Sequence, residues 1–367
     1  MTLERSQFVP DRVWPFDPGS QTYGSVVDRA ADPRRWTELV GADVQLVTQW
    51  DDGGHDGGAE PGRVPSSSAS MPTVVRAMLR ALDPRPGGHY LEVGTGTGET
   101  AARLARAVGP EGSVTSLEID AKLAAGARAN LERAGVRNVK VIHTDAWHGR
   151  PEGAPYDGVH VTCGVRRIPS AWVTQCVPGA RIVAPWGTDF TPHDWLLTLE
   201  VAADGSASGR FGMGLSFMKM RAQRRAHPDH DAYAPPGWLD RARRRETELT
   251  GAEARSTAIG DAALAIGLQV PDCTQHYAAT DDAVTVWLYS LTDNSMAAAG
   301  FADGMVSQAA QSGPRSLWDE LEAAWHRWLA HGRPASHQFG LTVDAQGQRP
   351  WLAPENGRRI PIGPQPT

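Results

Sequence analysis

The chain has 367 residues, of which 41% are hydrophobic and 21% are charged, and its formal net charge is −6. These values are ordinary for a folded globular protein, and the length allows more than one domain. The negative charge argues against a nucleic-acid partner, and no apolar run approaches the length of a membrane span. Three cysteines without metal-ligand spacing, and the lack of a signal-peptide core, favour a cytoplasmic location.

Residues 1–65 are expected to form an extension that packs on the rest of the protein. Its aromatic side chains are too numerous for a disordered tail. They are Trp14, Phe16, Tyr23, Trp36 and Trp50. Residues 51–62, rich in glycine, aspartate and proline, predict a loop within this extension.

A serine-rich run opens the main domain, which we place at residues 66–218. Ser66 to Ser70 precede Pro72, and proline is favoured in the first turn of a helix. Apolar residues at helical spacing follow, and they predict a helix with one buried face. They are Val74, Val75, Met78, Leu79 and Leu82.

The most informative stretch is residues 89–98, which read His-Tyr-Leu-Glu-Val-Gly-Thr-Gly-Thr-Gly. The apolar run predicts a buried parallel strand, and residues 99–108 have the spacing of a helix. Glycines between them allow a tight turn and a close approach of the backbone to a ligand. The residues expected to form this binding loop are Glu92, Gly94, Thr95, Gly96 and Gly98.

Two further predicted strands bring acidic residues to the same edge of the sheet. A strand over residues 113–119 contains Glu118, whose carboxylate can accept hydrogen bonds from both hydroxyls of a ribose. A strand over residues 139–143 is followed by Asp145 and Ala146. Because ligands bind at the carboxyl ends of parallel strands, these groups together predict a nucleoside site.

Strands and helices continue to alternate as far as residue 187. A helix is predicted over residues 121–134, and strands over 158–162 and 181–184, which implies a doubly wound parallel sheet with helices on both faces. Residues 195–201 and 209–217 predict an antiparallel pair that closes this sheet.

Residues 219–367 are expected to form a C-terminal accessory domain of mixed α+β structure. Residues 221–245 are basic and interrupted by proline, as in a linker, and 284–290 predict a strand. Residues 316–331 predict an amphipathic helix, whose tryptophans are more readily explained as core than as a peptide groove. A hairpin over residues 339–343 and 349–352 completes the predicted domain.

These motifs resemble those of class I S-adenosylmethionine methyltransferases, because the spacing of the glycines differs from the GxGxxG loop of dinucleotide binders. Within that class, residues 66–187 resemble the protein L-isoaspartate O-methyltransferase family. The matching pieces are Ser70-x-Pro72, Leu91 to Gly98, Leu117-Glu-Ile119, Ala154 to Thr162, Ile168-Pro169, Gln175 and Arg181 to Pro185.

The resemblance implies S-adenosylmethionine as the methyl donor and S-adenosylhomocysteine as the product. It places Asp145 beside the adenine, and Ser70 beside the donor and the substrate carboxylate. Ser67 and Ser68 are expected to line the donor, with a solvated loop as the alternative. The carboxylate would attack the methyl group in line, so that Ser70 orients it by a hydrogen bond and no strong base is needed.

The chain departs from the repair enzymes of this family, which usually carry His or Tyr after the proline where this chain has Thr73. Outer segments resemble an actinobacterial branch that is associated with ribosomally made peptides. They are the aromatic N-terminus and residues 162–169, 216–221, 313–318 and 340–343. Such enzymes methylate an aspartate of a lanthipeptide or graspetide precursor, and the ester can then close to a succinimide.

We therefore expect a carboxyl O-methyltransferase whose partner is a modified precursor peptide. Binding to nucleic acid or to a membrane is not expected, and the sequence leaves the oligomeric state open. Thr73, Arg166 and Arg167 are candidates for binding this peptide, with helix capping for Thr73 and a solvated loop for the arginines as alternatives. No metal site is expected, although His227 and His230 have a suitable spacing in a polar loop. The alternative functions are general isoaspartate repair and a non-catalytic peptide- or nucleoside-binding module.

Overall fold

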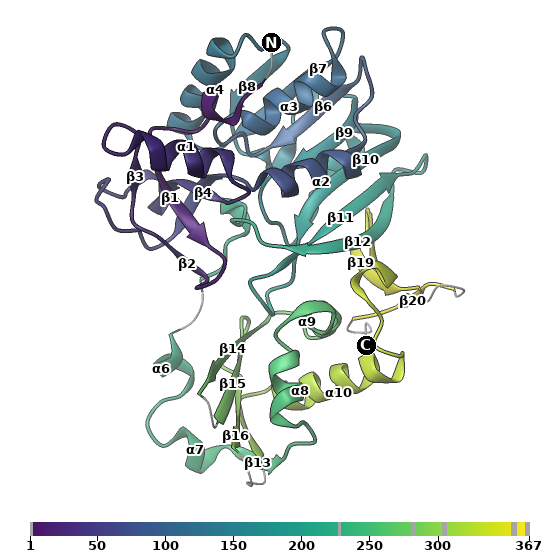
Figure 1. Cartoon of the computed structure of the whole chain (residues 1–367). Helices are drawn as coiled ribbons and strands as arrows, with labels where there is room; N and C mark the ends of the chain where they lie inside the picture. The colour runs from purple at the N-terminus through teal and green to yellow at the C-terminus, as the bar shows by residue number, and fades with distance from the viewer. Residues whose placement is uncertain (1–2, 227–228, 281–282, 303–306, 354–357, 364–367) are drawn as a thin grey trace.

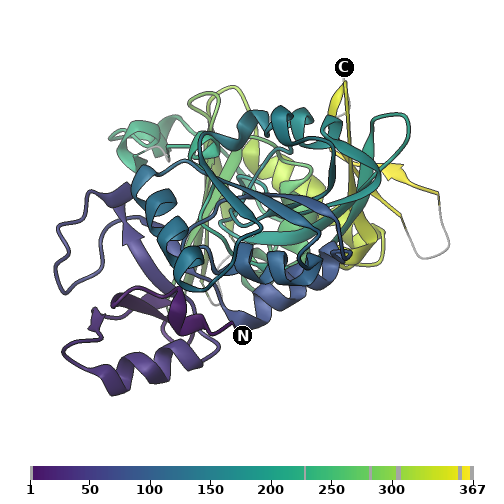
Figure 2. The same cartoon turned by 90° about the horizontal axis from the view of Figure 1, so that it is seen from above.

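A computed structural model describes residues 3–226, 229–280, 283–302, 307–353 and 358–363. Helices flank a central sheet in the upper part of Figure 1, and residues 3–69 form a smaller unit beside it. Below the sheet lies the C-terminal lobe, residues 230–330. Figure 2 shows that the N-terminal unit projects to one side of the main body.

The central sheet contains both the parallel strands and the closing antiparallel strands. They are β6 (His89–Val93), β7 (Ser113–Glu118), β8 (Val139–His143), β9 (Tyr156–Val161), β10 (Cys176–Trp186), β11 (Asp194–Val201), β12 (Ala207–Leu215), β18 (Phe339–Asp344), β19 (Gly347–Leu352) and β20 (Ile360–Pro361). Their order across the sheet is β20-β19-β18-β12-β11-β10-β9-β6-β7-β8. The strands from β8 to β10 are parallel, and the others are antiparallel to their neighbours.

Helices cover both faces of this sheet, as the alternation of its buried side chains requires. They are α2 (Pro72–Leu82), α3 (Glu99–Val108), α4 (Ala121–Arg133) and α5 (Ser170–Thr174). Tyr90 of β6 packs with α2 and α3 on one face, whereas its neighbour Leu91 lies in the core that contains Trp172 of α5. Short 3-10 turns, η3 (Ala146–His148) and η4 (Pro151–Gly153), connect β8 to β9. The predicted doubly wound sheet and the antiparallel pair after it are confirmed.

The N-terminal unit has a small sheet of its own. Its elements are η1 (Arg5–Gln7), β1 (Arg12–Asp17), β2 (Thr22–Tyr23), β3 (Val27–Asp28), α1 (Pro33–Gly41), β4 (Leu46–Trp50), η2 (Asp51–Gly53) and β5 (Pro65–Ala69). Trp14, Trp36 and Trp50 are buried in it, and Phe8 packs among residues of α3 and α4. The serine run forms β5, which pairs with β4. The boundary expected between residues 65 and 66 therefore falls inside a strand of this sheet.

The C-terminal lobe packs one face of a second sheet against helices. Its elements are α6 (His230–Tyr233), α7 (Trp238–Arg241), β13 (Arg243–Glu246), α8 (Gly251–Ser256), α9 (Gly260–Gly267), β14 (Cys273–Ala279), β15 (Ala283–Ser290), β16 (Met296–Ala302), β17 (Gln308–Ser312) and α10 (Leu317–Ala330). Trp318 and Trp325 of α10 are 0% and 3% exposed, so they are core as predicted, whereas Trp328, the third tryptophan of the stripe, is only partly buried. A final 3-10 turn, η6 (Ser336–Gln338), leads back to the central sheet.

The predicted C-terminal hairpin forms, but it belongs to a different sheet from the one expected. β18 pairs with β12 from Ala207↔Val343 to Arg210↔Gly340, which extends the central sheet. Backbone groups at the open edge of β12 thereby gain partners that sequence patterning does not reveal. Within the described ranges, each helix is too short or too polar to span a bilayer.

Candidate active site

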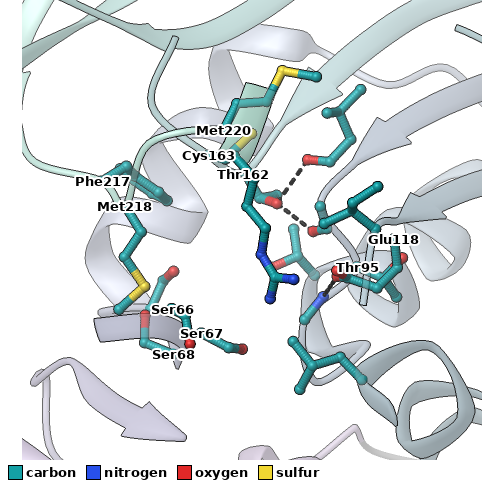
Figure 3. A pocket seen from close by; sticks show the side chains of 18 of the residues that line it. Ser66, Ser67, Ser68, Thr95, Glu118, Thr162, Cys163, Phe217, Met218 and Met220 are labelled. Carbon is teal, nitrogen blue, oxygen red and sulfur yellow. Dashed lines mark hydrogen bonds between the residues drawn. The ribbon is translucent and has the colours of Figure 1, made fainter. Parts of the chain in front are cut away.

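A cavity of about 370 Å³ lies at the carboxyl ends of β6, β7 and β8, where the parallel sheet was expected to bind its ligand. The glycine loop after β6 forms one wall and the serine strand β5 forms another. Residues 216–224, which we call the lid, form a further wall, and all of them except Gln223 line the cavity. In Figure 3, Phe217 and Met218 of the lid lie across the cavity from Glu118.

Gly96 marks the point where a ligand can come closest to the glycine loop. Its φ of +53° is a left-handed conformation, and a Cβ built there would meet no atom closer than Ser67 Oγ at 3.6 Å. The space beside Gly96 is therefore part of the cavity. Ser67 and Ser68 lie on β5 across that space, so both serines line the cavity as predicted.

Glu118 ends β7 with its carboxylate fixed by two backbone amides. Its Oε2 accepts from Gly96 N at 2.8 Å, and its Oε1 accepts from Asp120 N at 3.0 Å. A carboxylate has further lone pairs, so Glu118 can still accept hydrogen bonds from a ligand in the cavity. This position suits the predicted contact with ribose hydroxyls.

Asp145 and Ala146 both line the cavity after β8. Asp145 Oδ1 accepts from Trp147 N at 2.9 Å and so caps η3, and its side chain is exposed at the cavity mouth. The pair thus lies where the adenine contact was predicted, and that contact stays a prediction.

Ser70 lines the cavity at the end of β5, and its backbone is held by an arginine from the N-terminal unit. Arg5 is 7% exposed, and its guanidinium donates to the carbonyl oxygens of Val40, Ala42, Val44, Ala69 and Ser70 at 2.8–3.3 Å. Desolvation lowers the pKa of Arg5, while Glu99, 3.6 Å from its Nε, opposes that shift. The hydroxyl of Ser70 bonds to no residue that the structure describes, so it is available to a substrate.

The lid is attached to the central sheet by backbone and charged contacts. Met218 O and Met220 N bond to Gly164 at 2.9 Å, and Phe217 N donates to Asp194 Oδ2 at 3.1 Å. Asp194 is fully buried and forms an ion pair with Lys219. Burial raises the pKa of Asp194 and lowers that of Lys219, and the ion pair opposes both shifts. These contacts hold the lid over the cavity.

A second set of ion pairs joins the lid to the N-terminal unit and the loop after β7. Arg221 contacts Asp120 Oδ2 at 3.0 Å and Asp52 Oδ1 at 2.9 Å, and Arg224 contacts Asp52 Oδ2 at 2.8 Å. Gln49 of β4 donates to Asp120 at 3.1 Å. Three segments that are distant in sequence therefore close around one cavity.

Glu92, predicted to bind the ligand, lies behind the glycine loop and does not line the cavity. It is 0% exposed, accepts from Ser116 Oγ at 2.5 Å, and lies 3.9 Å from His160 Nδ1. The strand register explains why the Glu92 side chain is buried, because Ser116 and His160 lie beside Glu92 on the two neighbouring strands. Burial raises the pKa of Glu92 to about 8 and lowers that of His160 to about 4, so both are neutral in the folded protein near pH 6.

Two other predicted positions also lie outside the cavity. Gly98 begins α3 at a φ of +86° and packs against Ala127 of α4, where a Cβ would meet the Ala127 Cβ at 3.4 Å. Thr73 in the first turn of α2 donates to Asp43 from its amide at 2.8 Å and its hydroxyl at 2.6 Å. The unsatisfied amides of a helix start account for this contact, so the capping interpretation fits Thr73 and the substrate contact does not.

Arg166 and Arg167 line a different cavity, of about 450 Å³, between the central sheet and the C-terminal lobe. Neither residue reaches the donor side of the protein, but Ala222 and Arg224 of the lid line both cavities. Binding of the peptide by these two arginines stays a prediction, at a site separate from the donor cavity.

The cavity holds no described group suited to metal binding or to nucleophilic attack. Cys163 lines it, but burial raises the pKa of this thiol to about 12, which keeps it protonated. Among the described residues, no three His, Cys, Asp or Glu side chains converge as metal ligands. His227 lies outside the described residues.

Several lining residues were missed by the sequence reasoning. Thr162 directly follows β9, and its hydroxyl contacts Val93 O at 2.9 Å and also Gly94 O. A polar residue at the end of a predicted strand could have identified it. The lid motif was noticed as a family feature, but nothing local in it reveals that it covers the cavity.

The fold and this cavity together define a class I S-adenosylmethionine-dependent methyltransferase. The residues fit the donor: the space beside Gly96 admits a ligand that a side chain would exclude, and Glu118 and Asp145 stand at neighbouring strand ends. Residues 61–224 match the family described as Protein-L-isoaspartate(D-aspartate) O-methyltransferase (PCMT). The chain belongs to this family, as its similarity to named relatives also shows.

A protein from Pyrococcus horikoshii, named Protein-L-isoaspartate O-methyltransferase, is 40% identical over 164 residues, which are 44% of this chain and 72% of that protein. A Pyrococcus abyssi protein of the same name is 38% identical, and the match covers 74% of its length. The match to a Thermotoga maritima protein of that name, 38% identical, covers only 38% of its length.

A solved structure named protein-L-isoaspartate O-methyltransferase resembles almost the whole chain. It has a TM-score of 0.51 and 20% sequence identity, and the alignment covers 95% of this chain and 91% of that one. The similarity extends beyond residues 61–224, so the units on both sides of the family match have counterparts in the fold of that protein.

Proposed function

We propose that this chain uses S-adenosylmethionine to methylate the side-chain carboxylate of an aspartate in a ribosomally made, modified precursor peptide of the lanthipeptide or graspetide class. One observation carries the carboxylate chemistry: the hydroxyl of Ser70 lines the donor cavity and bonds to no described residue. Arg5 fixes the backbone beneath it, so the hydroxyl can donate to an incoming carboxylate from a defined position.

The donor supplies an electrophilic methyl group, and the residues of this chain orient the reactants. The loop at Gly96, with Glu118 and Asp145, would hold the nucleoside, and Ser70 would present the carboxylate. Phe217, with Met218 and Met220 of the lid, covers the cavity with apolar side chains and excludes water. A carboxylate is already ionised at neutral pH, so the site needs no general base.

The methyl ester formed in this way is a better electrophile than the acid. The backbone nitrogen of the following residue can attack the ester carbonyl, expelling methanol and closing a succinimide. This second step needs no group from the enzyme. The resemblance of the outer segments to enzymes that modify ribosomally made peptides supports a substrate different from that of the repair enzymes.

A second candidate function is methylation of isoaspartate in damaged proteins. The names of the relatives favour it, and so does the neighbour of similar fold, because a C-terminal lobe also occurs in a protein that carries that name. The lobe alone therefore does not distinguish the two candidates.

Mass spectrometry can separate the two functions. The enzyme and S-adenosylmethionine are incubated with a linear precursor, the modified precursor and an isoaspartyl peptide at equal concentrations. We expect a methyl adduct, or the mass loss of a succinimide, on the modified precursor only, because crosslinks preorganise the peptide and reduce the entropy lost on binding. Equal or faster methylation of the isoaspartyl peptide would assign the chain to repair.

A further inference from the structure

The lid also lines part of the cavity of about 450 Å³ below the central sheet. This cavity lies between Trp186 at the end of β10, Leu341 and Pro350 of the last hairpin, and Leu268 beyond α9. Figure 1 shows the region where α9 approaches the strands of the central sheet from below. Ala222 and Arg224 line both cavities, so the two cavities adjoin at this part of the lid.

The charged groups around this second cavity leave a positive surplus. Its lining includes four arginines but only two aspartates: Arg166, Arg167, Arg224, Arg225, Asp189 and Asp272. Asp189 pairs with Arg166 and lies 3.4 Å from Arg225, and Asp272 lies 2.7 Å from Arg225. Both aspartates are thus neutralised by two of the arginines.

Of the four arginines that line this cavity, Arg167 is the one with no charged partner in the described part of the chain. It is exposed, and its guanidinium forms no ion pair or hydrogen bond with the residues that the structure describes. Its backbone is fixed, because Gln223 of the lid accepts from Arg167 N at 2.9 Å and donates to Arg167 O at 2.9 Å. An exposed, unpaired guanidinium on a fixed backbone is well placed to bind an anion.

Two residues that line the same cavity also carry buried donors that lack acceptors among the described residues. They are Trp186 Nε1, on a side chain that is 4% exposed, and Arg166 Nη1. A buried N–H without an acceptor destabilises the folded protein. Indole and guanidinium groups can only donate, so the complementary group is an acceptor, such as a carboxylate.

We infer that this cavity is a subsite for an acidic side chain of the peptide substrate, near in sequence to the aspartate that Ser70 holds. The inference rests on the proposed function. The apolar walls formed by Trp186, Leu268, Leu341 and Pro350 accommodate the neighbouring residues, and Arg167 with the unpaired donors binds the carboxylate. The subsite would select peptides by a second negative charge, which the reaction itself does not require.

A glutamate scan tests the subsite. The probes are fluorescent derivatives of the modified precursor peptide that keep the acceptor aspartate and carry a glutamate at each of the flanking positions in turn, each matched by a glutamine peptide. At one spacing, glutamate should bind at least about 10-fold more tightly than glutamine, the scale of a charge-assisted hydrogen bond. Binding is measured by fluorescence polarisation with S-adenosylhomocysteine present, so the readout does not depend on methyl transfer.

Variants identify the residues responsible. Arg167→Glu should abolish the preference for glutamate, whereas Arg80→Glu, an exposed arginine on α2 outside both cavities, should retain it. Trp186→Phe should weaken binding of the glutamate peptide several-fold without lowering the thermal midpoint, because it removes an unpaired donor. A merely structural role for Trp186 would leave binding unchanged.

The outcomes separate this inference from the proposed function. Methyl transfer without any preference for glutamate, or a preference that survives Arg167→Glu, overturns the subsite and leaves the proposed function intact. A preference that depends on Arg167, found in a protein that methylates no peptide carboxylate, retains the subsite and overturns the function. No detectable binding by any of the peptides also overturns the subsite.

Discussion

Replacing Gly96 with leucine tests the donor site, because the new side chain would enter the space that the ligand is proposed to occupy. The position has a φ of +53°, and the nearest atom to a new Cβ is 3.6 Å away, so the protein has room for the first carbon. The rest of the side chain would fill the cavity. Overpacking a fitted site costs about 1–3 kcal/mol, which corresponds to an increase of about 5- to 150-fold in the Kd of S-adenosylhomocysteine.

Gly237→Leu is the matched control, because Gly237 lies outside the cavity, has a φ of +75°, and the nearest atom to a Cβ there is Asp240 Oδ2 at 3.7 Å. Both variants incur the left-handed backbone strain of about 1–2 kcal/mol, and both should lose a few degrees in thermal midpoint. Isothermal titration calorimetry should show weaker ligand binding only in Gly96→Leu. Unchanged affinity in that variant, with the fold verified by circular dichroism, would refute the assignment of the donor cavity.

Three further substitutions probe the catalytic, structural and electrostatic parts of the site. Ser70→Ala should lower turnover at saturating peptide by about one to three orders of magnitude, with little change in donor affinity; wild-type turnover would remove Ser70 from the mechanism. Arg5→Lys should lower the free energy of unfolding by about 2–4 kcal/mol in a denaturant titration, because one ammonium cannot serve five buried carbonyls; a loss below about 1 kcal/mol would contradict its structural role. Glu92→Gln should raise the thermal midpoint by an amount that grows from pH 4.5 to about pH 8. Burial raises the pKa of Glu92 from 4.5 to about 8, so the folded protein keeps a proton that the unfolded chain loses, and the wild type loses stability across this range. A pH-independent difference would contradict a neutral Glu92.

Much of the central sheet could be predicted because its signals are local. The run from β6 through α3 combines an apolar strand, glycines and helical periodicity within twenty residues, and the structure has both elements within the predicted bounds. The candidate site followed from the same pattern, since ligands bind at the carboxyl ends of parallel strands. Thr162 obeys this rule as well and could have been included.

Other features depend on contacts between distant segments. β16 reads Met-Ala-Ala-Ala-Gly-Phe-Ala, a composition with high helix propensity, yet it is a strand because β15 and β17 pair with both of its edges. The hairpin of β18 and β19 was predicted, but its pairing with β12 crosses more than a hundred residues. Tertiary packing decided both outcomes.

The errors at the site have the same origin. Glu92 belongs to the predicted strand, but only the register with Ser116 and His160 shows that its side chain points into the protein. Thr73 adjoins the serine motif in sequence, but Asp43, thirty residues earlier, takes both of its donors. Residue type and spacing located the site, whereas the direction of each side chain required the fold.

The most direct test of the central claim is to locate the transferred methyl group. The enzyme is incubated with S-adenosylmethionine carrying a deuterated methyl group and with the modified precursor peptide, and the quenched product is sequenced by tandem mass spectrometry. The account predicts the label on the side-chain carboxylate of one aspartate, and no label on a precursor in which that residue is asparagine. Label on any other atom, or no transfer to the modified precursor by a protein that binds the donor, would contradict it.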